Sequence, residues 1–322
     1  MKAAVIYQKG EMPQYTTVPE PATGNDNELI LTVKAAAIKH FDKSMAKGTH
    51  YSVRADKANA KVIGGDGVGV LADGTRVYAI GKGMVAEKAI IEKDRMVILP
   101  HGIDDALAAA LPNAVMGSAM ALRFRAGIKP GDTVLINGAT GFTGQIAVQL
   151  AKHYGAGTIV ATGRNLQSLE KLLTIGADQV IALNQGDEKF TAQVKEIHGN
   201  TPLDIIIDYL WGHTAELLLS CLKGDGSFTH STRFISVGAI TGDQIALSAA
   251  NLRSVNLQLT GSGLGSWTKD NIRSLFSDIL PEMLQLAADG KLKADVKKIN
   301  LKDIETLWDI DVPYGQRLVV MA

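Results

Sequence analysis

The stretch DTVLINGATGFTGQIAVQLAKHYG, residues 132–155, constrains the fold more than any other part of the sequence. It opens with an apolar run typical of a buried strand, turns at several glycines, and continues as an amphipathic helix that ends at Gly155. Ala139, Gly141 and Gly144 form an A-x-G-x-x-G pattern at the junction, a variant of the dinucleotide-binding fingerprint. In that pattern the first position allows a tight turn, the second admits a pyrophosphate, and the third lets helix and strand pack closely.

The residues after the turn are expected to present their backbone to a phosphate. Phe142, Thr143 and Gly144 open the predicted helix, where N–H groups and the positive end of the helix dipole attract anions. The alternative is a glycine-rich turn that joins a strand to a helix without any ligand. The strand before the turn and the helix after it favour the pyrophosphate site.

The second apolar run, TIVAT, ends in Gly163, Arg164 and Asn165, which we assign to the cofactor site. A site for NAD usually places Asp or Glu here to bind the ribose 2′-hydroxyl, whereas an arginine pairs with the 2′-phosphate of NADP. The sequence therefore predicts NADPH as the cofactor. The alternative is that Arg164 is only a solvated charge at the end of a strand.

The apolar pattern predicts an α/β fold with a second, β-rich part. From about residue 131, apolar runs of four to six residues alternate with helical stretches, which is typical of a doubly wound parallel sheet. Residues 1–100 indicate strands and turns, with Asp73-Gly74 as a hairpin signal. A chain of 322 residues suffices for two domains. We assign 111–249 to a Rossmann-like NADP(H)-binding domain, and 1–110 with 250–322 to a split β-rich domain shaped as a partly open barrel.

Composition narrows the classes of partner. Lys plus Arg and Asp plus Glu number 33 each, so no net charge favours nucleic acid or an anionic membrane, and a small-molecule substrate is expected. Cys221 is the only cysteine, which excludes an internal disulfide. The opening MKAAVIYQKG lacks the features of a secretory signal, so a cytoplasmic protein is expected. The uncharged stretch 106–122 contains Pro112 and Asn113 and indicates a buried segment, not a membrane span.

Five segments together resemble the medium-chain dehydrogenase/reductases, specifically their zinc-independent quinone oxidoreductase branch. They are AAAIKHFDKSMAKGTHY, IGGDGVGVL, KPGDTVLINGATGFTGQIAVQLAKHYGA, KLLTIGADQVI and the closing GQRLVV. The resemblance implies a GroES-like catalytic domain split around the Rossmann-like domain, with the cofactor in the cleft between them. It also implies a homodimer in which the strand VNLQLTGSG meets its two-fold mate.

The resemblance argues against a metal. Zinc-dependent members carry a cysteine ligand where this sequence has Lys39, and Gly-His-Glu where it has Gly64-Gly65-Asp66. The third ligand falls near Ala114. We therefore expect no metal site.

Without a metal, the expected chemistry is hydride transfer to a quinone or an α,β-unsaturated carbonyl. Lys39 lies where the zinc ligand approaches the substrate, so its ammonium is a candidate to stabilise a developing oxyanion or to donate a proton. Tyr51 matches a tyrosine that lines the pocket in relatives, and His50 is its neighbour. For Lys39 the alternative is an exposed lysine at a strand end, and for Tyr51 and His50 it is ordinary packing.

The resemblance assigns further residues to the cofactor. Ser118, in GSAMAL, takes the place of a threonine beside the nicotinamide, and the backbone near Gly238 follows another predicted strand. Gly261, Gly263 and Arg317 complete the expected set. Two other functions stay open at this point. One is an NADP-dependent alcohol or aldehyde reductase, and the other is a non-catalytic NADPH-binding sensor.

Overall fold

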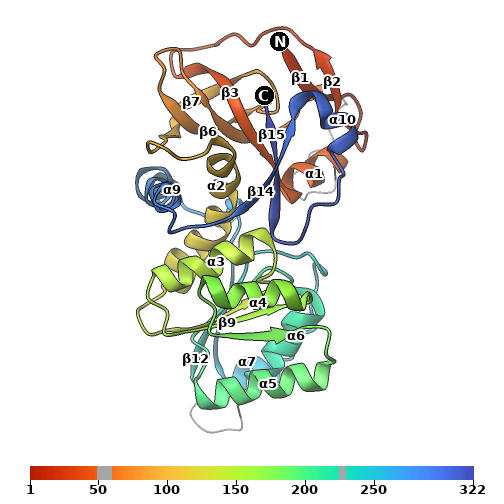
Figure 1. Cartoon of the computed structure of the whole chain (residues 1–322). Coiled ribbons are helices and arrows are strands. Elements are labelled where there is room, and N and C mark those ends of the chain that lie inside the picture. The colour runs from red at the N-terminus through yellow and green to blue at the C-terminus, as the bar shows by residue number, and fades with distance from the viewer. Residues whose placement is uncertain (49–59, 225–229) are drawn as a thin grey trace. The chain divides into compact units, whose positions relative to one another are not determined.

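The computed structural model describes residues 1–48, 60–224 and 230–322, which form two compact units. The β-rich unit comprises Met1–Pro112 with Phe276–Ala322, and the α/β unit comprises Asn113–Leu275 (Figure 1). The second boundary lies after Leu275 and not near residue 250. The reason is that strand β13 pairs with β12 and thereby extends the sheet of the α/β unit.

The α/β unit contains the predicted doubly wound sheet. Its six strands are all parallel and follow the order β10-β9-β8-β11-β12-β13. The central strands are buried along their whole length, as their uninterrupted apolar runs predicted. The strands are β8 (Thr133–Asn137), β9 (Thr158–Gly163), β10 (Gln179–Ala182), β11 (Ile205–Asp208), β12 (Ser231–Ser236) and β13 (Asn256–Gly261).

Helices connect these strands. Helix α3 packs beside α4, and α5 beside α6 (Figure 1). The winding direction reverses between β8 and β11, which makes the carboxyl ends of these two strands the topological switch point where such sheets bind ligands. The helices of this unit are α3 (Phe142–His153), α4 (Leu166–Ile175), α5 (Asp187–Asn200), α6 (Gly212–Cys221), α7 (Ala249–Ser254) and α8 (Lys269–Ser274), with the short η2 (Leu264–Ser266).

The β-rich unit is a partial barrel. Strands β3, β5, β6 and β7 pair in a closed ring, because β3 pairs with both β5 and β7. The end of the chain returns to this unit, where β15 pairs antiparallel with β3 and β14 lies parallel to β15 (Figure 1). The strands of this sheet are β3 (Glu28–Ile38), β5 (Asp66–Val70), β6 (Arg76–Lys82), β7 (Lys88–Ile98), β14 (Asp295–Asn300) and β15 (Gln316–Met321).

A second small sheet and several helices complete the β-rich unit. The small sheet has the order β2-β1-β4. Its strands are β1 (Lys2–Ile6), β2 (Gln14–Thr17) and β4 (Lys61–Val62), and the helices are α1 (His40–Lys47), η3 (Leu275–Ile279), α9 (Leu280–Ala288), η4 (Leu301–Asp303) and α10 (Ile304–Leu307). The unit boundaries fall within α2 (Asp105–Met120) and at the start of η3.

Glycines let β5 lie close to β3 in the barrel. A Cβ on Gly69 would come 2.3 Å from the Thr32 carbonyl oxygen, and one on Gly67 would come 2.7 Å from the Ala35 carbonyl oxygen. The predicted hairpin at Asp73-Gly74 joins β5 to β6, and Gly74 has a φ of +88° there. The short pattern DGVGVLADG thus encodes both a tight strand pair and its turn.

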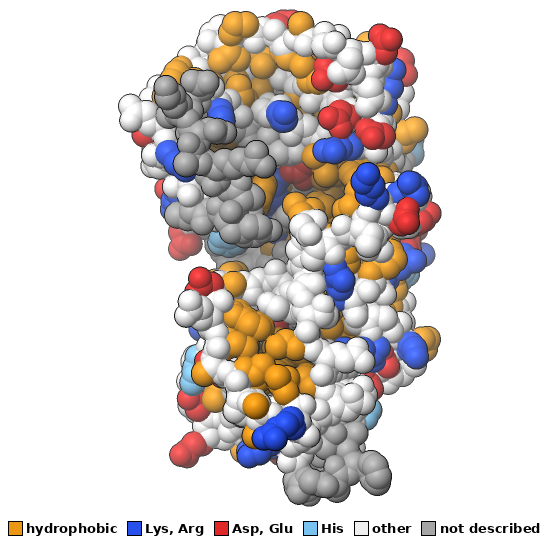
Figure 2. Space-filling model, turned by 180° about the vertical axis from the view of Figure 1, so that it is seen from behind, with side chains coloured by type: hydrophobic (Ala, Val, Ile, Leu, Met, Phe, Trp, Pro, Cys, Tyr) orange, Lys and Arg blue, Asp and Glu red, His pale blue; other side chains and the backbone are white. Residues whose placement is uncertain are grey.

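The uncharged stretch around Pro112 forms α2, which continues into the π-helical turn η1 (Ala121–Ala126). The run Asp105–Ala126 is long and apolar enough to cross a membrane, but 72% of an 18-residue apolar stretch within it is buried inside the protein, as is usual for a core helix. On the face seen in Figure 2, positive and negative side chains are interspersed, in keeping with equal numbers of acidic and basic residues.

Candidate active site

The glycine loop lies between the end of β8 and the start of α3, with Gly141 as the residue before the helix. A Cβ on Gly144 would come 2.6 Å from the Ala139 Cα, so only glycine fits there. A Cβ on Gly141, in contrast, would meet nothing nearer than the Gly138 carbonyl oxygen at 3.8 Å. Gly144 is therefore needed for packing, whereas the missing side chain at Gly141 leaves space that a pyrophosphate would occupy.

The end of β9 meets this loop. A Cβ on Gly163 would come 2.3 Å from Thr140 Cγ2, so the absence of a side chain lets the strand approach the loop. Arg164 is exposed, and its guanidinium has no ion pair with any residue in the described ranges. The side chain of Asn165 caps α4, where its Oδ1 accepts a hydrogen bond from Ser168 N at 2.8 Å. The capping role of Asn165 was not predicted, although asparagine before a helix is a signal for it.

Gly238 and Gly261 lie at the carboxyl ends of neighbouring strands. Gly238 follows β12, and a Cβ there would come 2.5 Å from the Tyr209 carbonyl oxygen. Gly261 ends β13, and Gly263 precedes η2. The structure therefore brings Gly238 and Gly261 to the same edge of the sheet as the glycine loop.

Ser118 is fully buried in α2. Its hydroxyl donates a hydrogen bond to the Ala114 carbonyl oxygen at 2.6 Å, one helical turn earlier. Because the hydroxyl hydrogen is used within the helix, Ser118 can offer a cofactor only an acceptor oxygen.

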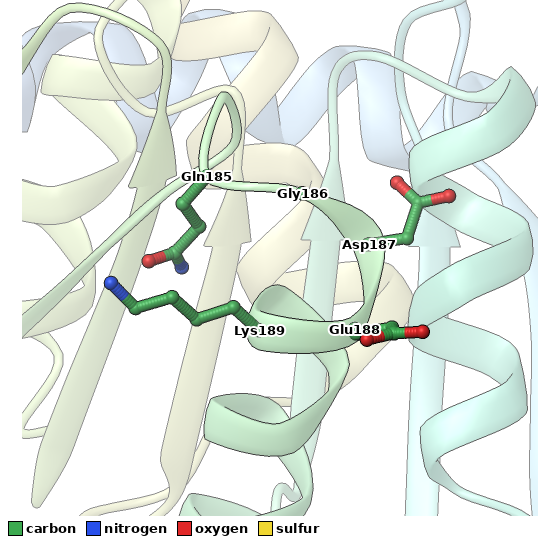
Figure 3. Close-up of a pocket in the computed structure, with 5 residues that line it drawn as sticks. All are labelled: Gln185, Gly186, Asp187, Glu188 and Lys189. Carbon is green, nitrogen blue, oxygen red and sulfur yellow. The ribbon is translucent and has the colours of Figure 1, made fainter.

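An open hollow lies at the start of α5, lined by residues 185–189 (Figure 3). The side chains of Gln185 and Lys189 point to one side of this segment, and those of Asp187 and Glu188 to the other (Figure 3). Two carboxylates in the first turn of a helix repel an anion, and Asp187 Oδ2 already lies 2.7 Å from His213 Nε2. This hollow is therefore not a phosphate site.

The β-rich unit contains a buried cluster of charges around Lys39. Lys39 directly follows β3 and precedes α1, and its ammonium forms an ion pair with Asp66 on β5. Asp42 Oδ2 lies 3.2 Å from Lys39 Nζ, and the Tyr78 hydroxyl donates to Asp66 Oδ2 at 2.8 Å. Lys39, Asp42, Asp66 and Tyr78 are all buried.

Burial and neighbouring charges together shift the pKa values of this cluster. Burial alone would lower the pKa of Lys39, but the attraction of Asp66 and Asp42 outweighs it, and the pKa is raised. Burial raises the pKa of Asp42, and Lys39 opposes this rise. Burial and the neighbouring Asp66 carboxylate raise the pKa of Tyr78 well above its ordinary value. At neutral pH Lys39 is thus a charged ammonium and Tyr78 a neutral phenol.

Arg317 also belongs to this part of the β-rich unit, since it lies on β15 and is buried. Burial lowers its pKa to about 10, although Asp42 and Asp66 both raise it. Its charge in turn contributes, after burial, to lowering the pKa of His40. Two cations and two carboxylates therefore share one buried region, with no net formal charge.

This geometry rules out the exposed alternative for Lys39, which is buried. Its ammonium already contacts three acceptors of its own chain, namely Asp66 Oδ1, Asp42 Oδ2 and the Ala37 carbonyl oxygen. A direct role of Lys39 toward a substrate stays a prediction. A protonated ammonium also has no lone pair for a metal, so the residues here do not fit a zinc ion. The other two predicted catalytic residues, His50 and Tyr51, lie outside the described residues.

Sequence reasoning missed a second buried group, at the switch point of the α/β unit. Asn137 ends β8 and Asp208 ends β11, and both side chains are completely buried. Burial raises the pKa of Asp208, while hydrogen bonds from Leu210 N and Asn137 oppose the rise. One signal was available, because each residue is the polar end of an otherwise apolar run.

Comparison with known proteins shows which sequences this chain resembles. A family model described as zinc-binding dehydrogenase matches residues 143–287. Quinone oxidoreductase 1 of Escherichia coli (strain K12) is 29% identical in an alignment that covers 96% of this chain and 96% of that protein. The quinone oxidoreductase of Sus scrofa is 27% identical over 259 residues, 78% of this chain and 75% of that protein.

The fold is shared with a solved quinone oxidoreductase. The crystal structure of the Escherichia coli quinone oxidoreductase complexed with NADPH matches with a TM-score of 0.84, covering 100% of both chains at 24% identity. Its agreement extends over the Rossmann-like sheet and the partial barrel alike, so the predicted fold class is confirmed. The chain is similar, over nearly its whole length, to the quinone oxidoreductase-like branch of the medium-chain dehydrogenase/reductase superfamily.

Proposed function

We propose that this protein is an NADPH-dependent oxidoreductase that works without zinc and reduces a quinone or an α,β-unsaturated carbonyl compound. The proposal rests mainly on two features. The space beside Gly141 is open, and Arg164, which follows the next strand, is exposed. The relatives named quinone oxidoreductases, one of them solved with NADPH, support the same cofactor and acceptor.

Each part of the α/β unit has a task in binding the cofactor. The Gly138–Gly141 turn and the amino terminus of α3 receive the pyrophosphate, because backbone N–H groups and the helix dipole favour an anion there. Arg164 pairs with the 2′-phosphate. Gly238 and Gly261 border the nicotinamide end. When bound, NADPH supplies the hydride, and the protein supplies position and exclusion of water.

The charges of the β-rich unit support a conjugated carbonyl compound as the proposed hydride acceptor. Reduction of an isolated carbonyl produces an alkoxide that gains most from a Lewis acid, whereas a quinone or enone spreads its charge by conjugation. The ammonium of Lys39 is held by two carboxylates and offers no open coordination position. We therefore assign Lys39 to the support of the site, and the proton to Tyr51, His50 or a water molecule.

Stopped-flow oxidation of NADPH and NADH tests the proposal, with a quinone, an enone and a simple aldehyde as acceptors, each with and without EDTA. Turnover of the quinone or enone with NADPH, unchanged by EDTA, is the expected result. Turnover of the aldehyde that EDTA abolishes would replace the proposal by an alcohol or aldehyde reductase. Tight NADPH binding without turnover of any acceptor would replace it by a sensor protein.

We further propose that the protein is a homodimer. Within the described residues, β13 pairs with β12 alone, so one edge of the sheet lacks a neighbouring strand. Such edges are normally covered, because unpaired backbone groups promote aggregation. Light scattering after size exclusion tests this proposal, which requires twice the mass of the 34.2 kDa chain.

A further inference from the structure

Asn137 and Asp208 form a buried hydrogen-bonded pair across the switch point of the sheet. They oppose each other in the register of β8 and β11, and Asn137 Nδ2 donates to Asp208 Oδ1 at 2.8 Å. A buried amide and a buried carboxylate cost free energy unless their hydrogen bonds are satisfied. The pair is therefore expected to organise the backbone around it, and two routes lead from it to the glycine loop.

The first route runs through Thr162 on β9. The Thr162 hydroxyl donates to Asn137 Oδ1 at 2.7 Å, and Thr162 Oγ1 in turn accepts a hydrogen bond from Gly138 N at 3.2 Å. Gly138 opens the glycine loop and has a φ of +82°. The amide of Asn137 thus fixes, through one hydroxyl, the backbone at the first residue of the loop.

The second route runs through the loop after β11. The carboxylate of Asp208 accepts hydrogen bonds from Leu210 N at 3.0 Å and from Trp211 N at 3.1 Å. The side chain of Leu210 lies against Gly138, where a Cβ would come 2.9 Å from Leu210 Cδ2. Both routes therefore end at Gly138. Thr162 binds its backbone N–H, and the Leu210 side chain fills the space that a side chain of residue 138 would occupy.

Trp211 shows that this loop is held under constraint. Its φ of 60° and ψ of −156° lie in a backbone region that is almost restricted to glycine. It is the only residue other than glycine with a positive φ in the part of the chain that the structure describes. Such conformations persist only where the surroundings impose them, and here Asp208 and Thr241 bind the loop, since the Thr241 hydroxyl donates to the Trp211 carbonyl oxygen at 3.0 Å.

We propose that Asp208 and Asn137 are positioning residues for the cofactor, which set the shape of the glycine loop and of the Tyr209–Gly212 loop beside it. The inference rests on the proposed function, since it takes the glycine loop as the pyrophosphate site. Neither side chain touches the pyrophosphate. Each acts through Gly138, so their loss weakens cofactor binding more than it weakens the fold.

The test exploits the chemistry of the pair. Asp208→Asn places two amides face to face, and Asn137→Asp places two carboxylates face to face. The double swap, Asn137→Asp with Asp208→Asn, restores one amide and one carboxylate. It recovers the hydrogen bond between the two side chains and those with Thr162 and Trp211 N, but not the one from Leu210 N, which shares Asp208 Oδ1 with Asn137. Thr232→Val is the matched control, because the buried Thr232 hydroxyl donates to the Leu203 carbonyl oxygen at 2.7 Å near the amino ends of β11 and β12 in the same sheet.

Fluorescence titration gives the Kd for NADPH, and thermal unfolding gives Tm, for each of these proteins. Each single variant of the pair is expected to raise the Kd about tenfold or more, the size of effect that one charge-assisted hydrogen bond supports. The double swap is expected to recover part of that loss, because the bond from Leu210 N stays broken. Thr232→Val is expected to lower Tm and to leave the Kd unchanged.

Hydrogen–deuterium exchange of the wild-type protein tests the inference without any variant. Added NADPH is expected to slow exchange in 208–212 together with 138–144. Unchanged exchange in 208–212, or an Asp208→Asn variant that loses Tm but keeps the wild-type Kd, would overturn the positioning role alone. A wild-type protein that binds no NADPH would overturn the proposed function, and this role with it.

Discussion

Lys39 and Asp66 form an ion pair inside the β-rich unit, with both side chains almost completely shielded from solvent. Asp42 Oδ2 lies 3.2 Å from the same ammonium, and Tyr78 donates a hydrogen bond to Asp66. Removing one member of such a group leaves uncompensated charge in a region where water cannot screen it. The cluster therefore makes the stability of this unit depend on Lys39.

Replacing Lys39 with methionine is expected to reduce the free energy of unfolding by about 3–5 kcal/mol, because two buried carboxylates lose their cation. Urea denaturation measures the change. Lys88→Met is the control, since Lys88 pairs with Glu20 at 2.7 Å on the surface and such pairs contribute about 1 kcal/mol or less. Adding Asp66→Asn to Lys39→Met should recover part of the loss. Equal costs for the two lysines would show that the buried pair is not important for stability.

Tyr78 is expected to make stability fall at alkaline pH. Its pKa is higher in the folded protein, where burial and Asp66 disfavour the phenolate, than in the unfolded chain. The stabilisation is therefore complete below about pH 10, the pKa of an unfolded tyrosine, and is lost as the pH rises toward the folded pKa. The advantage of the wild-type protein over Tyr78→Phe should shrink above that pH. Urea denaturation at several pH values measures it, and a constant difference would contradict the assignment.

Absorbance at 295 nm checks the same point directly. Folded wild-type protein and folded Tyr78→Phe should show the same rise in phenolate absorbance up to about pH 11, about one unit above the ordinary pKa of tyrosine. The wild-type protein should show additional phenolate only when it unfolds. A smaller rise for the folded variant would mean that Tyr78 ionises in the native state.

The sequence predicted those parts of the fold that depend on local pattern. The strands β8, β9 and β11 coincide with apolar runs, and Asp73-Gly74 forms the hairpin between β5 and β6. β14, in contrast, has the sequence DVKKIN and no apolar pattern. It lies at the edge of its sheet, where charged side chains can remain in water, so the signal of a buried strand was missing.

The charged and polar clusters depend on which strands become neighbours. Lys39 and Asp66 are 27 residues apart, and Asn137 and Asp208 are 71 residues apart. Only the order of strands in each sheet brings these pairs together. Lys39 was expected to be either catalytic or exposed, because its position after β3 does not show that two carboxylates and a carbonyl oxygen surround its ammonium. The sequence pattern placed Lys39 at the end of a strand, but only the tertiary structure determines which groups contact its ammonium.

The glycines of the cofactor loop are expected to respond differently to alanine. Gly141→Ala projects a methyl group into open space, so Tm should stay unchanged while the Kd for NADPH rises at least about tenfold, as expected when close approach to a charged group is lost. Gly144→Ala forces its Cβ against Ala139 and should cost about 1–3 kcal/mol of stability in addition. Gly199→Ala in α5, with nothing within 4 Å of its Cβ, is the control that should change neither cofactor affinity nor packing. Wild-type affinity in Gly141→Ala would remove the main support for the pyrophosphate site.

The choice between NADPH and NADH is expected to depend on Arg164. Its guanidinium is exposed and pairs with no acidic side chain of the described residues, so it is available to a 2′-phosphate. In Arg164→Asp the ratio of the two Kd values should shift toward NADH by at least about tenfold, because a charge-assisted bidentate pair is replaced by repulsion. The control is Arg253→Asp, which changes the same charge on α7 of the same unit. Titrations at two salt concentrations complete the test. The NADPH affinity of the wild-type protein should fall with ionic strength and that of Arg164→Asp should not, whereas an unchanged preference in Arg164→Asp would mean that another group binds the 2′-phosphate.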